Sequence, residues 1–545
     1  MGLLSIFPLG LTSAQSVLVW LVLGTCYFLL HAAYNLYFSP LANVPGPFFA
    51  KISGLPSYYH ALRGDRHIWI WQCHQIYGSK VRVTPSAVCF QSGQAFRDIY
   101  GFKANVQRSK MYSVWQRNKS SINTFTTTDL ALHHKKRRIL NPAFSEKSIR
   151  ASEVFVQKHI ERWIELLPDG DTKDWSQPKN MSEWTDNLVF DILCDLCFGR
   201  SLNVKDPGEN AFKGIPKAIH TYSTFNYPFT RSPFLGLLLW LKHRGVDKLM
   251  EIISPSDIKA YFAFIDESIA ARREAEELSE RLSIDGSING KGARQDMFHF
   301  LFQATDPDTG RKGYSPQELF AEAELLVIAG SDTTATTLSG FFFYIVRNPR
   351  PYKRLLKEIR STFDSAHEIV SGPKLSSCKY LRACIDETMR MAPAVPSDLS
   401  RTVLAGGLMI EGELYPAGVT VGASEWSNGR SEEYGDPNVY RPEQWIVDEE
   451  AGVTAEDVAR ISSIFHPFSY GWTNCPGQNL AILELLMTIA RTLYRFDVRA
   501  EPGSTLGEGS PELGWGRRDR RQFQLDDAYI SIRNGPMIQF KKRED

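Results

Sequence analysis

The cysteine with the most reactive setting in this chain is Cys475, in the segment FSYGWTNCPG at residues 468–477. An amphipathic helix is predicted directly after it, over residues 478–494. A cysteine just ahead of a helix N-terminus meets the positive end of the helix dipole and free backbone N–H groups, which favour the thiolate. Gly471 and Gly477 would let the backbone approach a flat, bulky partner. A lone cysteine in such a place is usually unremarkable chemically, but the pattern F-x-x-G-x-x-x-C-x-G is much rarer.

A second group of candidates occupies the middle of a long predicted helix. Residues 315–318 (SPQE) combine a capping serine, a first-turn proline and a glutamate that completes a capping box. No stop signal follows until Asn348, which predicts a helix of about 30 residues, or about 45 Å. Its centre reads AGSDTT at residues 329–334. Glycine and β-branched threonines weaken a helix there, so it can open for a ligand or water. Taken alone, a threonine-rich segment is more often packing.

Two charged segments complete the set of candidates. Glu387 and Arg390 are three residues apart and therefore share a helix face, although such pairs are also common on surfaces. The run HHKKRR at residues 133–138 is basic, and it would suit an acidic partner or a solvated face. Lys plus Arg number 62 and Asp plus Glu 61, a net charge of +1, so nothing in the overall charge points to nucleic acid.

In this order and spacing, the segments resemble the cytochrome P450 family, the haem-thiolate monooxygenases, and the likeness extends over nearly the whole chain. The resemblance implies that Cys475 is the axial ligand of the haem iron and donates electron density that favours O–O cleavage. It implies that Asp332 and Thr333 relay protons to the oxygen, and that Glu387 and Arg390 are structural. The cofactor-binding positions that it implies are Phe468, Gly471 and Gly477 in the cysteine loop, Ala329 and Gly330 on the long helix, and His133, Arg137 and Arg401 at the haem propionates.

Two positions depart from the family pattern. The family has Arg or His two residues before the ligand cysteine, where this chain has Thr473, which can donate one neutral hydrogen bond. The family motif P-E-R-F reads Pro442-Glu443-Gln444-Trp445 here, so Gln444 replaces the arginine that completes a triad with Glu387 and Arg390. We therefore expect haem retention or stability to be lower than in relatives, or one propionate contact to be supplied from elsewhere.

The remaining sequence predicts a membrane anchor and one large helix-rich domain. Residues 1–50 contain no Asp, Glu, Lys or Arg, and residues 16–38 are long and apolar enough to cross a bilayer. We expect an anchor over residues 1–39, a proline-rich hinge over 40–50 and a catalytic domain over 51–545. Lys51, Arg63 and Arg66 follow the span, which places the domain in the cytosol. The predicted fold class is mainly α with minor β, the cytochrome P450 fold plus one transmembrane helix.

The predicted function is insertion of one oxygen atom from O2 into a hydrophobic small molecule, such as a fungal secondary metabolite, at the endoplasmic reticulum membrane. The chain has no flavin or NADPH fingerprint, so electrons would come from NADPH through a separate NADPH-cytochrome P450 reductase, with cytochrome b5 as a second donor. Membrane lipid is a further expected partner, and nucleic acid is not. Two alternatives remain open here: a haem-thiolate isomerase or peroxygenase that needs no reductase, and a non-catalytic haem-binding membrane sensor.

Overall fold

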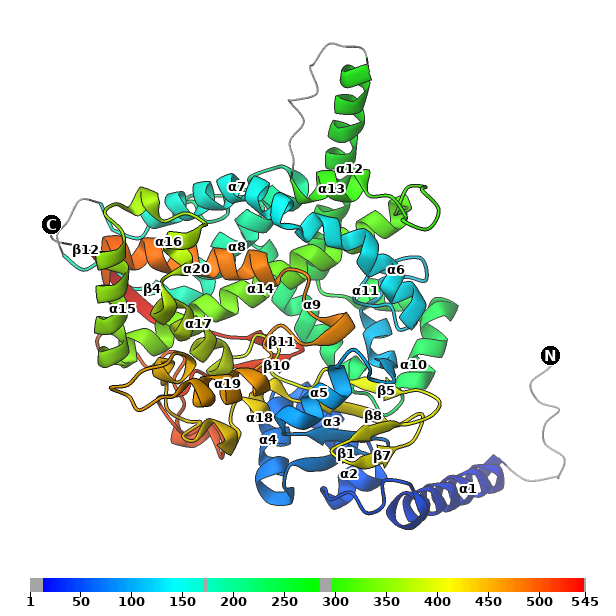
Figure 1. The fold of residues 1–545 in the computed structure, drawn as a ribbon. Helices are drawn as coiled ribbons and strands as arrows, with labels where there is room; N and C mark the ends of the chain where they lie inside the picture. The colour runs from blue at the N-terminus through cyan, green and yellow to red at the C-terminus, as the bar shows by residue number, and fades with distance from the viewer. Residues whose placement is uncertain (1–12, 171–173, 285–295, 544–545) are drawn as a thin grey trace.

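The computed structural model describes residues 13–170, 174–284 and 296–543. Helices dominate it, and the prediction of a helix-rich domain with small sheets is confirmed (Figure 1). The helices at its centre are α7 (Glu146–Glu165), α8 (Met181–Phe198), α14 (Pro316–Arg347), α17 (Lys379–Met391) and α20 (Gln478–Arg495). The others are α2 (Phe48–Ile52), α3 (Leu55–Leu62), α4 (Arg66–Tyr77), α5 (Gly93–Tyr100), α6 (Leu130–Leu140), α9 (Ile215–Thr230), α10 (Leu235–Leu241), α11 (Asp247–Ile253), α12 (Ser256–Ile284), α13 (Met297–Gln303), α15 (Pro349–Thr362), α16 (Pro373–Ser376), α18 (Glu425–Asn428) and α19 (Ala455–Ile464).

Helix α14 organises the core, as its length predicts. It spans 32 residues and begins with the predicted capping box: Ser315 Oγ accepts from the Glu318 backbone, while the Glu318 side chain accepts from the Ser315 N–H. It packs against α8, α17 and α20. Gly330 makes the contact with α8 close, because a Cβ there would lie 2.7 Å from the side chain of Leu193. The main hydrophobic cluster of the molecule surrounds this helix.

The largest sheet has five strands in the order β1-β2-β8-β5-β3. Strands β1 and β2 form an antiparallel hairpin at one edge of this sheet. The strands of this sheet are β1 (Lys80–Thr84), β2 (Ala87–Phe90), β3 (Val106–Arg108), β5 (Arg401–Val403) and β8 (Thr420–Ala423). Three smaller sheets comprise β6 (Leu408–Ile410) with β7 (Glu413–Tyr415), β10 (Asp526–Ala528) with β11 (Ile530–Ile532), and β4 (Lys179–Asn180), β12 (Met537–Lys542) and β9 (Phe496–Ala500).

The apolar N-terminal segment forms one helix that extends away from the body beside the five-stranded sheet (Figure 1). It consists of α1 (Ser13–Ala33) and the π-helical turn η1 (Tyr34–Phe38). Within residues 14–38, a window of 18 residues has a mean hydropathy of 1.8 and contains no buried residue. The hinge that follows packs on the sheet, since Leu41 and Val44 are buried. Arg82 of β1 donates to the carbonyl oxygens of Asn35 (2.7 Å) and Leu41 (3.1 Å). The end of the helix and the hinge are therefore attached to the domain.

Candidate functional site

The helix predicted after Cys475 is present as α20, and the cysteine loop, residues 468–477, leads directly into it. The Cys475 N–H donates to the Phe468 carbonyl at 2.8 Å, which closes the loop, and Gly471 has φ +70°. A Cβ at Gly471 would lie 2.1 Å from the Tyr100 carbonyl oxygen, so only glycine fits there. The Cys475 side chain itself is exposed. Burial of the loop raises the pKa of the thiol, while the N–H of Gly477, the charge of Arg137 and the N–H of Gln478 act in the opposite direction.

At the midpoint of α14, one side of the helix is accessible. Ala329 is exposed and Thr333 is half-buried, whereas the helix from residue 334 to residue 345 is buried throughout. Thr333 Oγ1 donates to the Ala329 carbonyl at 2.8 Å, so its hydroxyl is held along the helix by a single bond. Asp332 points elsewhere: its Oδ1 accepts from His220 Nε2 (2.7 Å) and Arg533 Nη1 (2.9 Å). Its Oδ2 is buried and has no hydrogen-bond partner among the residues that the structure describes. The acid and the hydroxyl therefore lie on different sides of the helix.

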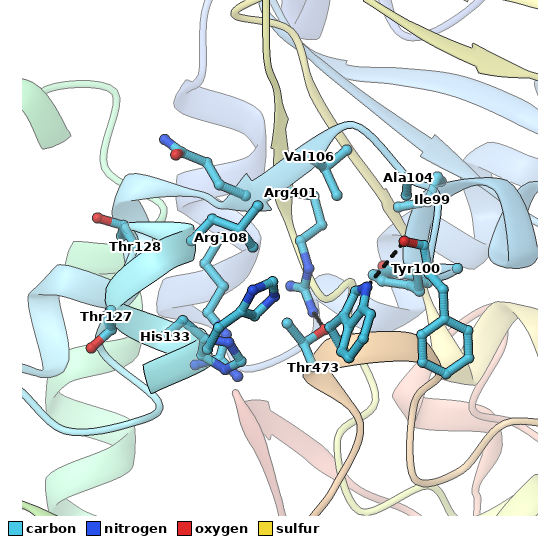
Figure 2. A pocket seen from close by; sticks show the side chains of 16 residues that line it. Ile99, Tyr100, Ala104, Val106, Arg108, Thr127, Thr128, His133, Arg401 and Thr473 are labelled. Atoms are coloured by element: carbon cyan, nitrogen blue, oxygen red, sulfur yellow. Dashed lines mark hydrogen bonds between the residues drawn. The ribbon is translucent and has the colours of Figure 1, made fainter. Parts of the chain in front are cut away.

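A cavity of about 100 Å³ lies between α5, β3, α6 and β5 (Figure 2). Its lining includes Arg401 and His133, which the sequence predicted, and Arg108, which it did not. Arg401 Nη2 donates to Thr473 Oγ1 (3.0 Å), so Thr473 acts as an acceptor here. Arg108, at the end of β3, donates to the Phe125 carbonyl (2.7 Å), and its buried Nε has no partner. Burial and the nearby Arg401 charge lower the pKa of Arg108 to about 10. Among the described residues, Arg108 and Arg401 donate to backbone carbonyls and hydroxyl groups, and neither is paired with a carboxylate.

His133 lies in the same cavity as a neutral donor. Its ring is 3% exposed and neither ring nitrogen has a hydrogen-bond partner among the described residues. Burial, followed by the charge of Arg108, lowers its pKa to about 3, so the imidazole is uncharged and carries one N–H. Arg137, one helical turn further along α6, instead donates to the backbone carbonyl and side-chain oxygen of Asn474, both at 2.9 Å. It therefore braces the cysteine loop.

The other three basic residues of the run at 133–138 all pair with acidic residues of the chain. Lys135, Lys136 and Arg138 could have formed a docking face for an acidic partner, but each has an acidic partner within the chain. Lys136 is buried with Glu318 (2.7 Å), and Lys135 lies 2.8 Å from Asp306. Arg138 pairs with Asp308. Lys136 is thus buried in the fold, whereas the side chains of Lys135 and Arg138 remain about half exposed in their ion pairs.

Glu387 and Arg390 are buried, which rules out a surface pair. Glu387 accepts five hydrogen bonds: Nε and Nη2 of Arg390 (both 2.8 Å), Nε2 of Gln444 (2.6 Å), Nε1 of Trp445 (3.0 Å) and the backbone N–H of Arg441 (2.7 Å). Arg390 uses its remaining donors on the carbonyls of Gly429, Pro437 and Val439. Gln444 stands in the place of the usual arginine, so it donates one hydrogen bond to Glu387 but carries no charge. Its Oε1 is buried and has no hydrogen-bond partner among the described residues. The pair joins α17 to η7 (Pro442–Trp445) and to the segment before it.

Three residues of the site were missed in the sequence. Arg108, His220 and Arg533 each lie far from the recognised segments in the chain, and only the fold brings them to the cavity or to Asp332. Arg108 is the last residue of a strand of only three residues, and His220 lies on a helix without any motif. A charged residue within a short, largely apolar stretch was the only available signal, and it is a weak one.

Comparison with known proteins identifies the family. The cytochrome P450 family model matches residues 45–512. The chain is 32% identical to the cytochrome P450 monooxygenase AKT7 of Alternaria alternata over 97% of each chain. It is 33% identical to the cytochrome P450 monooxygenase apf7 of Gibberella fujikuroi over 98% of this chain and 99% of that one. Among solved structures, the crystal structure of the cytochrome P450DA heme domain has the same fold, with a TM-score of 0.67, 16% identity, and coverage of 92% of this chain and 98% of that one. This chain therefore belongs to the cytochrome P450 family and is a monooxygenase that uses haem with a cysteine thiolate on the iron.

Proposed function

We propose that Cys475 supplies that thiolate, and that the chain oxidises a hydrophobic small molecule at a membrane with electrons from a separate reductase. The observation that carries the proposal is the position of Cys475, with an exposed sulfur at the start of α20 and backbone N–H groups of residues 477 and 478 directed at it. Such N–H groups stabilise a thiolate. When bound, the haem supplies the oxygen-activating chemistry; the protein positions it and controls its protons.

The cavity beside β3 and β5 fits the carboxylates of a haem. Arg401 is buried and Arg108 is half-buried, and neither guanidinium pairs with a carboxylate among the described residues. The neutral His133 offers one further N–H. Two propionates would neutralise both cations and accept that N–H, and a planar guanidinium suits a carboxylate. Arg108 is thus proposed to provide the contact that Thr473 cannot. In this arrangement, the unpaired N–H groups of Arg108 and His133 would donate to the propionates.

The substrate side is proposed to be aromatic in character. Tyr529 stands at the turn between β10 and β11 with φ +73°, and its ring lies 5.4 Å from that of Phe125 and 5.9 Å from that of Trp115. Trp115 in turn lies 5.8 Å from Tyr222 of α9. Rings of this kind provide apolar contact area together with hydroxyl groups. Terpenoids, polyketides, alkaloids and small aromatic compounds are the substrate classes that fit, in line with a role in secondary metabolism.

The membrane side is proposed to include more than α1. Helices α10 and α11 have no buried residues within their described parts, so the apolar run at 235–241 is not core. The exposed apolar side chains on and beside α10 and α11 are Phe234, Leu237, Trp240, Leu249, Ile252 and Ile253. Those on α2 and α3 are Phe48, Phe49, Leu55, Tyr59 and Leu62. A Cβ at Gly54 would touch Pro233 at 3.4 Å, which joins the two groups. A patch of this kind suits a lipid surface.

The proposed location is the endoplasmic reticulum membrane, with the domain in the cytosol. Lys51 and Arg63 follow the span and remain partly or fully exposed, as cytosolic flanking charges should be. Arg66 does not belong to this set, because it is buried and paired with Asp398. NADPH-cytochrome P450 reductase is the proposed electron donor, with cytochrome b5 as a second donor.

The first experiment is the reduced, carbon monoxide-bound difference spectrum of the detergent-solubilised protein beside a Cys475→Ser variant. We expect a red-shifted thiolate Soret band that the variant lacks. A matched control is Cys378→Ser, a buried thiol on a different part of the chain, which should leave the band in place. If Cys475→Ser keeps the thiolate band, the assignment of the ligand is wrong. Consumption of NADPH that requires added reductase would separate this function from a reductase-independent one.

A further inference from the structure

The loop at residues 123–127 lies against α14, about two turns before the middle of that helix. Asn123 Nδ2 donates to the Ala321 carbonyl at 3.0 Å. The backbone N–H and the Oγ1 hydroxyl of Thr124 both donate to Glu322 Oε1, at 2.8 and 2.9 Å. The loop is therefore joined to two successive residues of α14.

These bonds lie where the accessible side of α14 ends. Glu322 precedes Ala329 by seven residues, or about two turns, so both residues lie on the same side of the helix. That side is exposed at Ala329 and half-buried at Thr333, whereas Glu322 is 0% exposed. The loop thus covers the helix face that is open two turns further along.

The loop also carries an aromatic ring of the proposed substrate side. The ring of Phe125 is half-buried and lies 5.4 Å from that of Tyr529. Arg108 donates to the carbonyls of Thr124 and Phe125, the second at 2.7 Å. The backbone around this ring is therefore held from two directions, by Arg108 through its carbonyl oxygens and by Glu322 through Thr124.

Glu322 is an expensive residue to place at this point of the fold. Its Oε2 is buried and has no hydrogen-bond partner among the described residues, which costs stability. Lys136 Nζ lies 3.8 Å from Glu322 Oε1 but only 2.7 Å from Glu318. Burial raises the pKa of Glu322 to about 7, against the charge of Lys136 and the bonds from Thr124. The two bonds from Thr124 are what this buried group provides in return.

We propose that Glu322 is a positioning residue that limits the length of the substrate: through Thr124 it holds the Phe125 ring as the end wall of the substrate space. The inference rests on the proposed function, because it takes the haem and the substrate to lie beside Ala329 and Thr333. It adds a selection by shape, since compact molecules fit against this wall and extended ones do not.

The test measures how molecules of increasing length bind to the detergent-solubilised holoenzyme. The probes are imidazole, N-phenylimidazole and N-biphenylylimidazole. An imidazole nitrogen that coordinates the haem iron shifts the Soret band, so a titration gives the dissociation constant of each probe. The ratio of the constants for N-biphenylylimidazole and imidazole reports how far the space extends, and no known substrate is needed.

Three variants separate the anchor from a general loss of stability. Glu322→Ala removes both bonds, and Glu322→Gln keeps an acceptor oxygen for Thr124. Glu318→Ala is the matched control, because Glu318 lies one turn earlier on α14 and bonds to Lys136 and to the Ser315 N–H. It removes a carboxylate from the same helix and leaves the two bonds to the loop in place.

For Glu322→Ala we expect the ratio to fall about 10-fold in favour of the long probe, near the effect of losing one hydrogen bond. Glu322→Gln should stay within about threefold of wild type, and Glu318→Ala should match wild type. If Glu322→Ala changes the binding of all three probes by the same factor, it does not set the length of the space and the proposal is overturned.

A double-mutant cycle tests whether Glu322 acts through Phe125. Phe125→Ala should lower the ratio as Glu322→Ala does, because it removes the wall itself. In the Phe125→Ala background, Glu322→Ala should then change the ratio by less than about twofold, since variants that act on one contact are not additive. If Glu322→Ala keeps its full effect in that background, Glu322 does not act by holding the Phe125 ring.

A second readout does not depend on ligand binding. Hydrogen exchange of the peptide that contains residues 123–127 should be about 10-fold faster in Glu322→Ala than in wild type, and unchanged in Glu318→Ala. Equal protection in wild type and Glu322→Ala would show that Glu322 does not anchor the loop. If wild type gives no Soret shift with any probe but this protection depends on Glu322, the proposed haem site fails while the anchor stands.

Discussion

Replacing Glu387 with glutamine tests the reading of the buried pair most directly. The carboxylate accepts five donors, two on Oε1 and three on Oε2. A glutamine amide retains one acceptor oxygen and turns an NH2 group towards the donors of the other side. Whichever way the amide is oriented, at least two buried donors lose their acceptor, and the Arg390 charge loses its counter-ion.

The expected cost follows from these losses. Breaking a buried ion pair by removing one partner costs about 3–5 kcal/mol. Unfolding entropy is about 2 cal/mol/K per residue, so a domain of roughly 500 residues has about 1 kcal/mol/K. The midpoint of thermal unfolding of Glu387→Gln should therefore fall by about 3–5 °C. Thermal unfolding followed by tryptophan fluorescence, with the haem absorbance recorded in parallel, measures it.

The matched control is Asp497→Asn. Asp497 pairs with Arg360 at 2.7 Å but is 43% exposed, so its loss should cost about 1 kcal/mol or less and shift the midpoint by about 1 °C or less. If the two variants unfold at the same temperature, the assignment of a large stabilising role to Glu387 is refuted. Both substitutions replace a carboxylate by its amide, so the comparison contrasts a buried carboxylate with five donors and a half-exposed one with a single donor.

Other predictions concern the haem cavity, the missing triad arginine and pH. Arg108→Leu should reduce haem retention, and Thr473→Arg should restore it in that background; haem content after gel filtration measures both. Gln444→Arg should raise the midpoint of unfolding, and an unchanged midpoint would reject the idea that this departure lowers stability. The hydrogen bond from His299 lowers the pKa of Glu276 from 4.5 to about 2. The stability that Glu276 contributes should be complete above pH 4.5 and lost as the pH falls towards 2, and hydrogen exchange in α13 should show this loss in wild type but not in Glu276→Gln.

Local signals explain why so much of the fold could be predicted. The capping box at residues 315–318, the stop at Asn348 and the glycine pattern around Cys475 each express a preference of the nearby backbone, and the structure follows them. Burial is a property of the folded chain. Lys136 and Arg66 belong to segments that look like exposed basic surface, yet both are buried in ion pairs with residues distant in sequence.

The same reasoning separates the parts of the candidate site. Cys475 and Asp332 lie in dense motifs that can be recognised alone, whereas Arg108 and His220 acquire their surroundings only when β3 meets β5 and α9 meets α14. Thr473 illustrates the intermediate case. Its departure from the pattern predicts a weaker contact, but only the fold reveals that Arg401 donates to its hydroxyl and that Arg108 shares the cavity.

The attachment of the anchor through Arg82 has a consequence for how the enzyme sits in the cell. Because the guanidinium is bonded to the carbonyls of Asn35 and Leu41, the end of the helix cannot swivel independently of the five-stranded sheet. In the proposed membrane orientation, the tilt of α1 in the bilayer would therefore set the orientation of the whole domain, and with it the depth of Phe234 and Trp240 relative to the lipid. An apolar molecule dissolved in the membrane would then meet this apolar surface at the same depth in every copy of the enzyme.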